Sequence, residues 1–287
     1  MSRDRAAVVR RLAGSPPREV RPDGTVALAD GRLALLKSTP GQVDAEVAGL
    51  RWLAGPSEVP VPAVIGHDER WLLLEYLPPA PPDAEAAARF GARLARLHLA
   101  GAPAFGAAPP GGPVDARIGL APMRNVAGTN WPSWYAEHRV LPYLRTASDD
   151  GQLAADEVAT VEAACAVLPE VAGPPVEPAR LHGDLWSGNV CWSARDGRTE
   201  AWVIDPAAHG GHPETDLAML ALFGCPHLES VLAGYREVTP LAAGWAERVG
   251  LHQMFPLLVH VVLFGRGYAG QAIAAARSAL RLAGGIP

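Results

Sequence analysis

The chain has 287 residues, a formal net charge of −5 and 49% apolar residues. This length is enough for about two domains, and the apolar content predicts a folded core rather than a disordered chain. The negative charge offers no basic surface for a nucleic acid or an anionic membrane.

Three further features predict a cytoplasmic protein. Residues 1–14 carry positive charges without the apolar core of a secretory signal, and the apolar run 256–264 is too short to cross a bilayer. The three cysteines, Cys165, Cys191 and Cys225, lack metal-type spacing, which favours reduced thiols over a disulfide or zinc framework.

The first part of the chain is rich in strand signals. A short helix is expected over 4–12, followed by strands that turn at Asp23-Gly24 and Asp30-Gly31, with the last strand ending near Lys37. Residues 42–54 have helical periodicity, and 71–76 form an apolar strand. The proline-rich segment 78–83 then separates a domain of residues 1–78 from one of residues 79–287.

The second part is mostly helical. Asp83 can cap a helix that runs to about Leu99, and another helix is expected over 153–168. Residues 190–205 predict a hairpin that turns at Asp196-Gly197. Two or three helices are expected after Asp216. The fold class is therefore α+β, with a small antiparallel sheet and one main helix followed by a larger helical lobe.

The strongest chemical signal is the segment 182–189, His-Gly-Asp-Leu-Trp-Ser-Gly-Asn. An aspartate followed five residues later by an asparagine has the spacing of the protein-kinase catalytic loop. In such a loop Asp184 accepts the proton of the acceptor hydroxyl, and the amide oxygen of Asn189 binds magnesium.

A second metal ligand is predicted at Asp205, which follows an apolar strand and precedes Pro206. The hairpin between Asn189 and Asp205 would bring the two side chains together. Each of the three polar residues could alone be a turn or cap residue, but their order and the hairpin together favour a magnesium site.

Lys37 and Glu46 are predicted to bind ATP. Lys37 is the only lysine among 25 basic residues, so its retention indicates a need for an ammonium group that arginine does not meet. Glu46 lies on the following helix and can face inward to pair with it, as in kinases.

Two further segments complete the ATP-binding prediction. The backbone of Glu75, Tyr76 and Leu77 is placed at the hinge between lobes, where it would bind the adenine edge. Asp216 precedes an apolar helix and is either a helix cap or a support for the catalytic loop.

With these residues in place, the chain resembles the fructosamine kinase (ketosamine-3-kinase) family, a branch of the aminoglycoside-phosphotransferase-like kinases with a protein-kinase-like fold. Segment 181–189, with Trp186 and Gly188, is similar to that family's signature, and the resemblance continues through 205–207, 214–219, 222–224 and 263–268. One segment departs: 20–25 has a single glycine in place of a glycine-rich phosphate loop. Fewer free backbone N–H groups are therefore expected there and a looser hold on the phosphates, unless Arg21 compensates.

The resemblance implies ATP and Mg²⁺ as cofactors and phosphorylation of the 3-hydroxyl of a ketoamine, such as a fructosamine or ribulosamine, in deglycation. His182, Trp186 and Trp131 are assigned to the acceptor side, although Trp186 could equally be a core residue. Two alternatives stay open: another small-molecule phosphotransferase acting on an aminoglycoside, choline or homoserine, and a non-catalytic pseudokinase. A monomer or weak dimer is expected.

Overall fold

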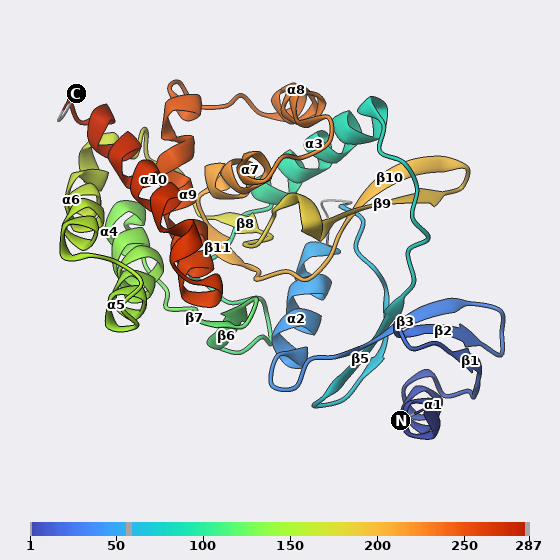
Figure 1. The fold of residues 1–287 in the computed structure, drawn as a ribbon. Helices are drawn as coiled ribbons and strands as arrows, with labels where there is room; N and C mark the ends of the chain where they lie inside the picture. The colour runs from blue at the N-terminus through green and yellow to red at the C-terminus, as the bar shows by residue number, and fades with distance from the viewer. Residues whose placement is uncertain (1, 56–58, 285–287) are drawn as a thin grey trace.

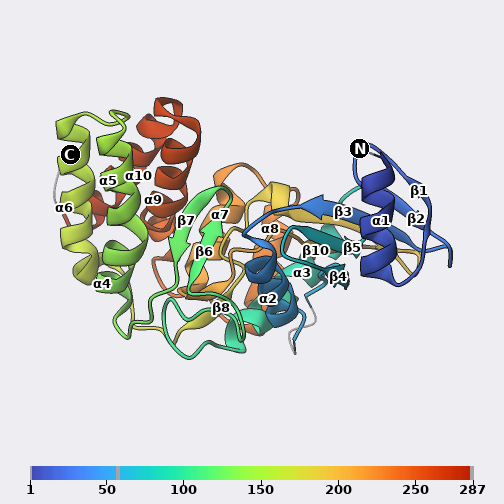
Figure 2. The ribbon, with the colours of Figure 1, turned by 90° about the horizontal axis from the view of Figure 1, so that it is seen from below.

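The computed structural model describes residues 2–55 and 59–284. An N-terminal sheet and a larger, mostly helical region lie at opposite ends of the molecule (Figures 1 and 2). The main sheet is antiparallel and is built from the first part of the chain, whereas most helices come from the second part, so the predicted α+β class is confirmed.

The N-terminal sheet is antiparallel and has the order β1-β2-β3-β5-β4. Asp-Gly turns connect its first three strands as predicted, and Lys37 on the third strand lies opposite Leu72 on the fifth. The strand β4 was not predicted, because a four-residue segment containing Gly66 has no clear alternation of apolar and polar residues. The strands are β1 (Pro17–Val20), β2 (Thr25–Leu28), β3 (Leu33–Ser38), β4 (Val64–His67) and β5 (Trp71–Glu75).

Two helices accompany this sheet, α1 (Ser2–Ala13) and α2 (Val43–Leu53). The helix α2 lies between the sheet and the helical region in Figure 1. It buries Val43, Val47 and Leu50 against Leu72 and Leu74. This apolar stripe confirms the helical periodicity seen in the sequence.

The helix α3 (Ala84–Leu99) opens the larger region. Its first turn is capped as predicted, because a side-chain oxygen of Asp83 accepts the N–H of Ala86 at 2.7 Å. Beside it lies the hairpin of β9 (Val190–Arg195) and β10 (Arg198–Val203), which turns at the predicted Asp196-Gly197. Two shorter strands, β8 (Ala179–Leu181) and β11 (His209–Gly211), pair beneath the catalytic loop.

The remaining region contains more elements than the sequence predicts. After residue 212, the part of the chain up to 284 forms four α-helices instead of two or three, because Gly224, Gly244 and Gly265 adopt positive φ angles and interrupt the apolar pattern. These helices are α7 (Pro213–Leu222), α8 (Leu228–Val238), α9 (Trp245–Phe264) and α10 (Ala269–Leu282).

Two other groups of elements were also not predicted. The hairpin of β6 (Asp115–Ile118) and β7 (Ala121–Arg124) follows a loop rich in glycine and proline. The helices α4 (Trp131–Tyr135) and α5 (Leu141–Asp149) contain proline in their first turns, where proline is tolerated, and a π-helix (Ala136–Val140) joins them. The predicted helix over 153–168 is present as α6 (Ala155–Val171).

The apolar run 256–264 forms the second half of α9, a helix that packs against α5 and α10 in the largest core cluster. Across residues 2–55 and 59–284, every helix is too short or too polar to span a membrane.

Candidate active site

The catalytic-loop segment begins at the end of β8 and turns sharply at Gly183. The φ angle of Gly183 is +81°, and a Cβ atom there would lie 2.1 Å from the carbonyl oxygen of Ala207. Only glycine fits this turn, which explains the His-Gly-Asp order in the sequence.

His182 fixes the path of this loop. Its side chain is fully buried; Nδ1 accepts the N–H of Asp184 at 3.3 Å, and Nε2 donates to the carbonyl oxygen of Ile204 at 2.9 Å. Burial lowers the pKa of His182, which keeps the ring neutral. The acceptor contact assigned to His182 from the sequence is therefore not supported, because both ring nitrogens bind backbone.

Asp216 supports the same loop from below. Its carboxylate accepts the backbone N–H groups of His182 at 2.8 Å and Gly183 at 3.0 Å. Nε2 of His98 approaches it at 3.2 Å. Burial raises the pKa of Asp216, but the hydrogen bond and charge of His98 outweigh this effect and hold it below its usual value. The geometry fits the supporting role predicted for Asp216, in addition to its place at the start of α7.

Asp184 has an unusual electrostatic environment. Burial is the largest effect on its carboxyl and, with the negative charges of Asp205 and Asp216, raises its pKa to about 7 against an opposing hydrogen bond from Asn189. A base whose pKa lies near neutrality can both accept and release a proton under physiological conditions. This property suits the predicted catalytic role.

Asn189 and Asp205 lie at the two ends of the β9–β10 hairpin. The N–H of Ile204 donates to the carbonyl oxygen of Asn189 at 3.1 Å, so the ends of the hairpin are held together. Asp205 has a φ angle of +52°, a strained conformation for a residue other than glycine that costs about 1–3 kcal/mol. Strain of this kind, retained beside Asp184, indicates that the direction of the Asp205 carboxylate is functionally constrained.

The donor set fits a magnesium ion. Nδ2 of Asn189 donates to the backbone oxygen of Asp184 at 2.7 Å and to its carboxylate at 3.1 Å. This leaves the amide oxygen of Asn189 as an available ligand, and the Asp205 side chain is 47% exposed. A carboxylate and an amide oxygen are the hard ligands that Mg²⁺ prefers, with phosphates and water completing the shell.

Lys37 joins the N-terminal sheet to this group. Its Nζ lies 2.9 Å from Oε1 of Glu46 and also contacts a carboxylate oxygen of Asp205. Burial lowers the pKa of Lys37, but the two carboxylates raise it further, so the ammonium stays charged. Glu46 is 8% exposed because α2 approaches the 205–208 segment closely: a Cβ on Gly49 would lie 3.0 Å from Pro206.

The hinge residues have distinct backbone roles. The N–H of Glu75 donates to Ala63 at 2.9 Å, and the N–H of Tyr76 donates to Leu33 at 3.2 Å, so both groups are used within the sheet. Within residues 2–55 and 59–284, Leu77 makes no backbone hydrogen bond through its N–H. Of the three predicted hinge residues, Leu77 is therefore the one with a free donor.

The glycine-poor turn after β1 uses its own N–H groups. Arg21 donates to Thr25 at 2.8 Å, Gly24 donates to Arg21 at 3.1 Å, and Thr25 donates to the side chain of Asp23 at 2.9 Å. Arg21 forms an exposed ion pair with Glu19 instead of pointing alone into solvent. Few donors are thus left for phosphate groups, as the sequence predicts.

Trp186 is not a core residue. It is 37% exposed, and its indole covers Gly188: a Cβ there would lie 2.1 Å from the indole ring. The edge of Trp186 meets Phe223, whose ring centroid is 6.1 Å away. Phe223 also packs against the rings of His260 and Tyr268. These rings form an aromatic surface beside the catalytic loop, and the sequence did not predict this surface.

Trp131 lies elsewhere. It is 5% exposed and stacks on Tyr135 and His252, with ring centroids 4.8 Å apart in both pairs. With Phe105 and His212 it lines a cavity of about 230 Å³. The stacking belongs to the helical core, so it gives no support to the acceptor role assigned to Trp131.

His212 belongs to a buried polar cluster with Glu214 and His252, whose ligand atoms lie within 4.8 Å of one another. Arg248 binds both carboxylate oxygens of Glu214, at 2.6 and 2.9 Å. Nδ1 of His212 accepts the N–H of Glu214. These bonds engage both oxygens of Glu214 and one nitrogen of His212, and the cluster joins α7 to α9.

Comparison with known proteins places this geometry in a family. The family model described as fructosamine kinase matches residues 37–281. A probable ketoamine kinase of Klebsiella aerogenes is 34% identical over 244 residues, which cover 82% of this chain and 78% of that protein. The chloroplastic protein-ribulosamine 3-kinase of Arabidopsis thaliana is 34% identical over 200 residues, covering 68% of this chain and 57% of that protein.

A solved structure, a candidate fructosamine-3-kinase from Thermobifida fusca YX-ER1, superposes with a TM-score of 0.89. The two chains are 48% identical, and the match covers 96% of this chain and 98% of the other. The predicted protein-kinase-like fold is thereby confirmed. The family match begins at Lys37, so the glycine-poor turn before it lies outside the matched segment.

Proposed function

This chain belongs to the fructosamine kinase family and is an ATP-dependent kinase. From that membership we propose which hydroxyl group accepts the phosphoryl group and which residues carry out the transfer. The γ-phosphoryl group of ATP passes to the 3-hydroxyl of a ketoamine of the fructosamine or ribulosamine type. The relatives named ketoamine kinase and ribulosamine 3-kinase support this acceptor class. The physiological consequence is deglycation of the amine.

One observation carries the assignment of the site. Lys37 from the sheet contacts Asp205 at the end of the hairpin, while Asn189 at its other end bonds to Asp184. A phosphate-binding cation, two oxygen ligands for a metal and a base thus belong to one connected group.

Asp184 is the proposed general base. It orients the acceptor hydroxyl and takes its proton as the oxygen attacks the γ-phosphorus. Lys37, held by Glu46, binds the α- and β-phosphates, and the hinge at Glu75 to Leu77 binds the adenine through the free N–H of Leu77. Most of the rate enhancement comes from positioning and from charge stabilisation by these fixed groups.

Asn189 and Asp205 are the residues that would hold the metal, for which we propose Mg²⁺. When bound, Mg²⁺ neutralises charge on the β- and γ-phosphate oxygens. Asp184 remains outside the ligand set, because it must stay available for the acceptor proton.

The exposed indole of Trp186 forms the proposed wall of the acceptor site, two residues beyond the base. A ketoamine carries a protonated secondary amine next to its sugar chain, and aromatic faces attract such cations. The adjoining rings of Phe223 and Tyr268 support an acceptor that bears both a sugar and an amine.

We propose that the enzyme is cytoplasmic and has two lobes, residues 1–78 and residues 79–287. It acts as a monomer or weak dimer, and its substrate is a small-molecule or amine-linked ketoamine. Nucleic acid and membrane are not proposed partners, given the net charge of −5.

An acceptor screen tests the acceptor assignment. ATP consumption by the purified chain is measured with ribuloselysine, fructoselysine and kanamycin, and with no acceptor as the blank. We expect turnover with a ketoamine well above the blank. Turnover with kanamycin alone would instead establish an aminoglycoside kinase, and magnesium-dependent ATP binding without turnover on any acceptor would establish a pseudokinase.

A further inference from the structure

The β9–β10 hairpin carries both proposed metal ligands, Asn189 just before its first strand and Asp205 just after its second. The two strands pair along their whole length, from Val190 opposite Val203 to Arg195 opposite Arg198. A tilt of this hairpin would therefore move both ligands together. Backbone bonds from Ala80 to Trp192 and from Val203 to Pro60, both 2.9 Å long, hold the hairpin along its strands. Its remaining freedom to tilt depends on what holds the face toward α3.

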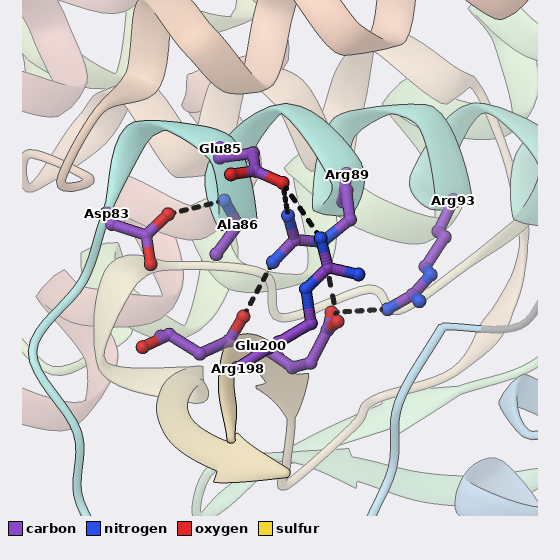
Figure 3. A network of polar contacts seen from close by, with 8 residues as sticks. Asp83, Glu85, Ala86, Arg89, Arg93, Arg198 and Glu200 are labelled. Atoms are coloured by element: carbon purple, nitrogen blue, oxygen red, sulfur yellow. Dashed lines mark hydrogen bonds and ion pairs between the residues drawn. The ribbon is translucent and has the colours of Figure 1, made fainter. Parts of the chain in front are cut away.

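The helix α3 holds that face through charged side chains (Figure 3). Nη1 of Arg93 lies 2.6 Å from Oε2 of Glu200, in the middle of β10. Nη2 of Arg89, one turn earlier, donates to the backbone oxygen of Thr199 at 2.8 Å. Two arginines of one helix thus bind adjacent residues of one strand. Arg93 binds the carboxylate of Glu200, and Arg89 binds the main chain of Thr199 and also lies, through Nε, 3.4 Å from Oε1 of Glu200.

Burial distinguishes the contacts of Glu200 from the exposed part of the network. The side chains of Glu200, Arg93 and Arg89 are 14%, 24% and 25% exposed, whereas those of Arg198 and Glu85 are 68% and 73% exposed. Exposed pairs contribute little because water and salt screen them. The partly buried contacts of Glu200 are therefore the charged contacts able to fix the hairpin.

The same helix also supports the catalytic loop. Near its C-terminal end, His98 contacts Asp216, which accepts the two N–H groups preceding Asp184. The helix itself is immobilised by α8: a Cβ on Gly91 would lie 1.8 Å from the carbonyl oxygen of Val231. The two backbones are in direct contact, so α3 is a rigid reference for both the base and the metal ligands.

We propose that Arg93 and Glu200 are positioning residues for the metal site: their ion pair, supported by Arg89, fixes the β9–β10 hairpin so that Asn189 and Asp205 face the phosphates. Through His98 and Asp216, α3 also positions the base, Asp184, relative to these two ligands. This inference rests on the metal roles proposed for Asn189 and Asp205, and it assigns a function to side chains that touch neither nucleotide nor acceptor.

The test uses the full chain without any acceptor. The rise in melting temperature produced by ATP is measured while Mg²⁺ is titrated, and again with ATP and a chelator. In Arg93→Ala we expect the Mg²⁺ concentration for half-maximal stabilisation to rise on the order of tenfold, as for other residues that orient metal ligands. The stabilisation by metal-free ATP should be unchanged, because Lys37 and the hinge are intact.

Two matched variants separate positioning from general stability. Arg93→Lys keeps an ion pair with Glu200 and should titrate within about twofold of the wild type. Arg96→Ala removes an exposed arginine one turn further along the same helix and should titrate like the wild type. If Arg93→Ala does not fold, Glu200→Gln, which keeps the side-chain shape, takes its place.

Three results would overturn the inference. The first is a Mg²⁺ titration of Arg93→Ala or Glu200→Gln equal to the wild type, even with a lower melting temperature. The second is an equal effect in Arg96→Ala. The third is a wild-type chain with no Mg²⁺-dependent stabilisation, which removes the metal roles on which the inference rests. Absence of ketoamine turnover, by contrast, would contradict only the proposed acceptor, because no acceptor is present here.

Discussion

At the scale of single residues, the fold holds Asp184 and Asp205 in unfavourable arrangements. Asp184 is placed where burial and two neighbouring carboxylates disfavour its ionised form, while Asp205 is held with a positive φ angle. Neither arrangement stabilises the empty protein. Groups that are costly for stability and clustered at one point are typical of functional sites.

The first residue-scale prediction concerns pH. Asp184 must be ionised to accept a proton, so kcat/KM should rise with pH through the pKa of the free enzyme, about 7, and level off above it. The profile of kcat should lie at lower pH, since a cation bound beside Asp184 favours its charged form. Initial rates between pH 5.5 and 9 test this; a kcat/KM that is flat from pH 6 to 8 contradicts it.

The second residue-scale prediction concerns the acceptor wall. In Gly188→Ala the new methyl group would collide with the indole of Trp186, which must turn away. We expect the KM for the ketoamine to rise on the order of tenfold while the KM for ATP stays within about twofold. Gly270→Ala, where no atom lies within 4 Å of the added Cβ, is the control. Equal effects on both substrates would place Trp186 outside the acceptor site.

At the scale of elements, the glycine-poor turn between β1 and β2 lies before the segment that the family model matches. It is held by its own hydrogen bonds and carries the charged side chain of Asp23. The carbonyl oxygen of Gly24 accepts the N–H of Leu36, so the turn lies next to Lys37. A negative charge at this position opposes the binding of triphosphate.

We therefore predict that Asp23→Asn lowers the KM for ATP about two- to threefold at low salt, with kcat unchanged. Asparagine keeps the oxygen that accepts the N–H of Thr25. The matched control is Asp30→Asn, which changes the same kind of turn at the other end of β2. An unchanged KM in Asp23→Asn, or an equal decrease in Asp30→Asn, contradicts this account of the turn.

The elements also show how far the sequence could be used. Hairpins with Asp-Gly turns and the capped helix α3 were predictable because local chemistry determines them. The strand β4 and the helices α4 and α5 were not, since tertiary packing stabilises segments whose glycine and prolines suggest loops.

At the scale of the whole molecule, the site is assembled from residues far apart in the chain. Lys37 stands out in the sequence because it is the only lysine, and Asp184 and Asp205 because of the catalytic-loop spacing and the hairpin that follows it. The sequence did not point to His98, Phe223 or Tyr268, because only the folded chain brings them to Asp216 and Trp186. His182 and Trp131 were assigned to the acceptor side from residue type. Both side chains are buried, which favours a structural role for each.

The most direct test of the central claim compares the wild type with Asp184→Ala, using ATP, Mg²⁺ and ribuloselysine, and follows phosphorylated ketoamine by ³¹P NMR. The wild type should produce a phosphate ester at the 3-hydroxyl. Asp184→Ala should be slower by about 10²–10⁴-fold, the usual contribution of a general base, while ATP still raises its melting temperature. Equal rates for the two proteins, or no phosphate ester from the wild type, would contradict the account.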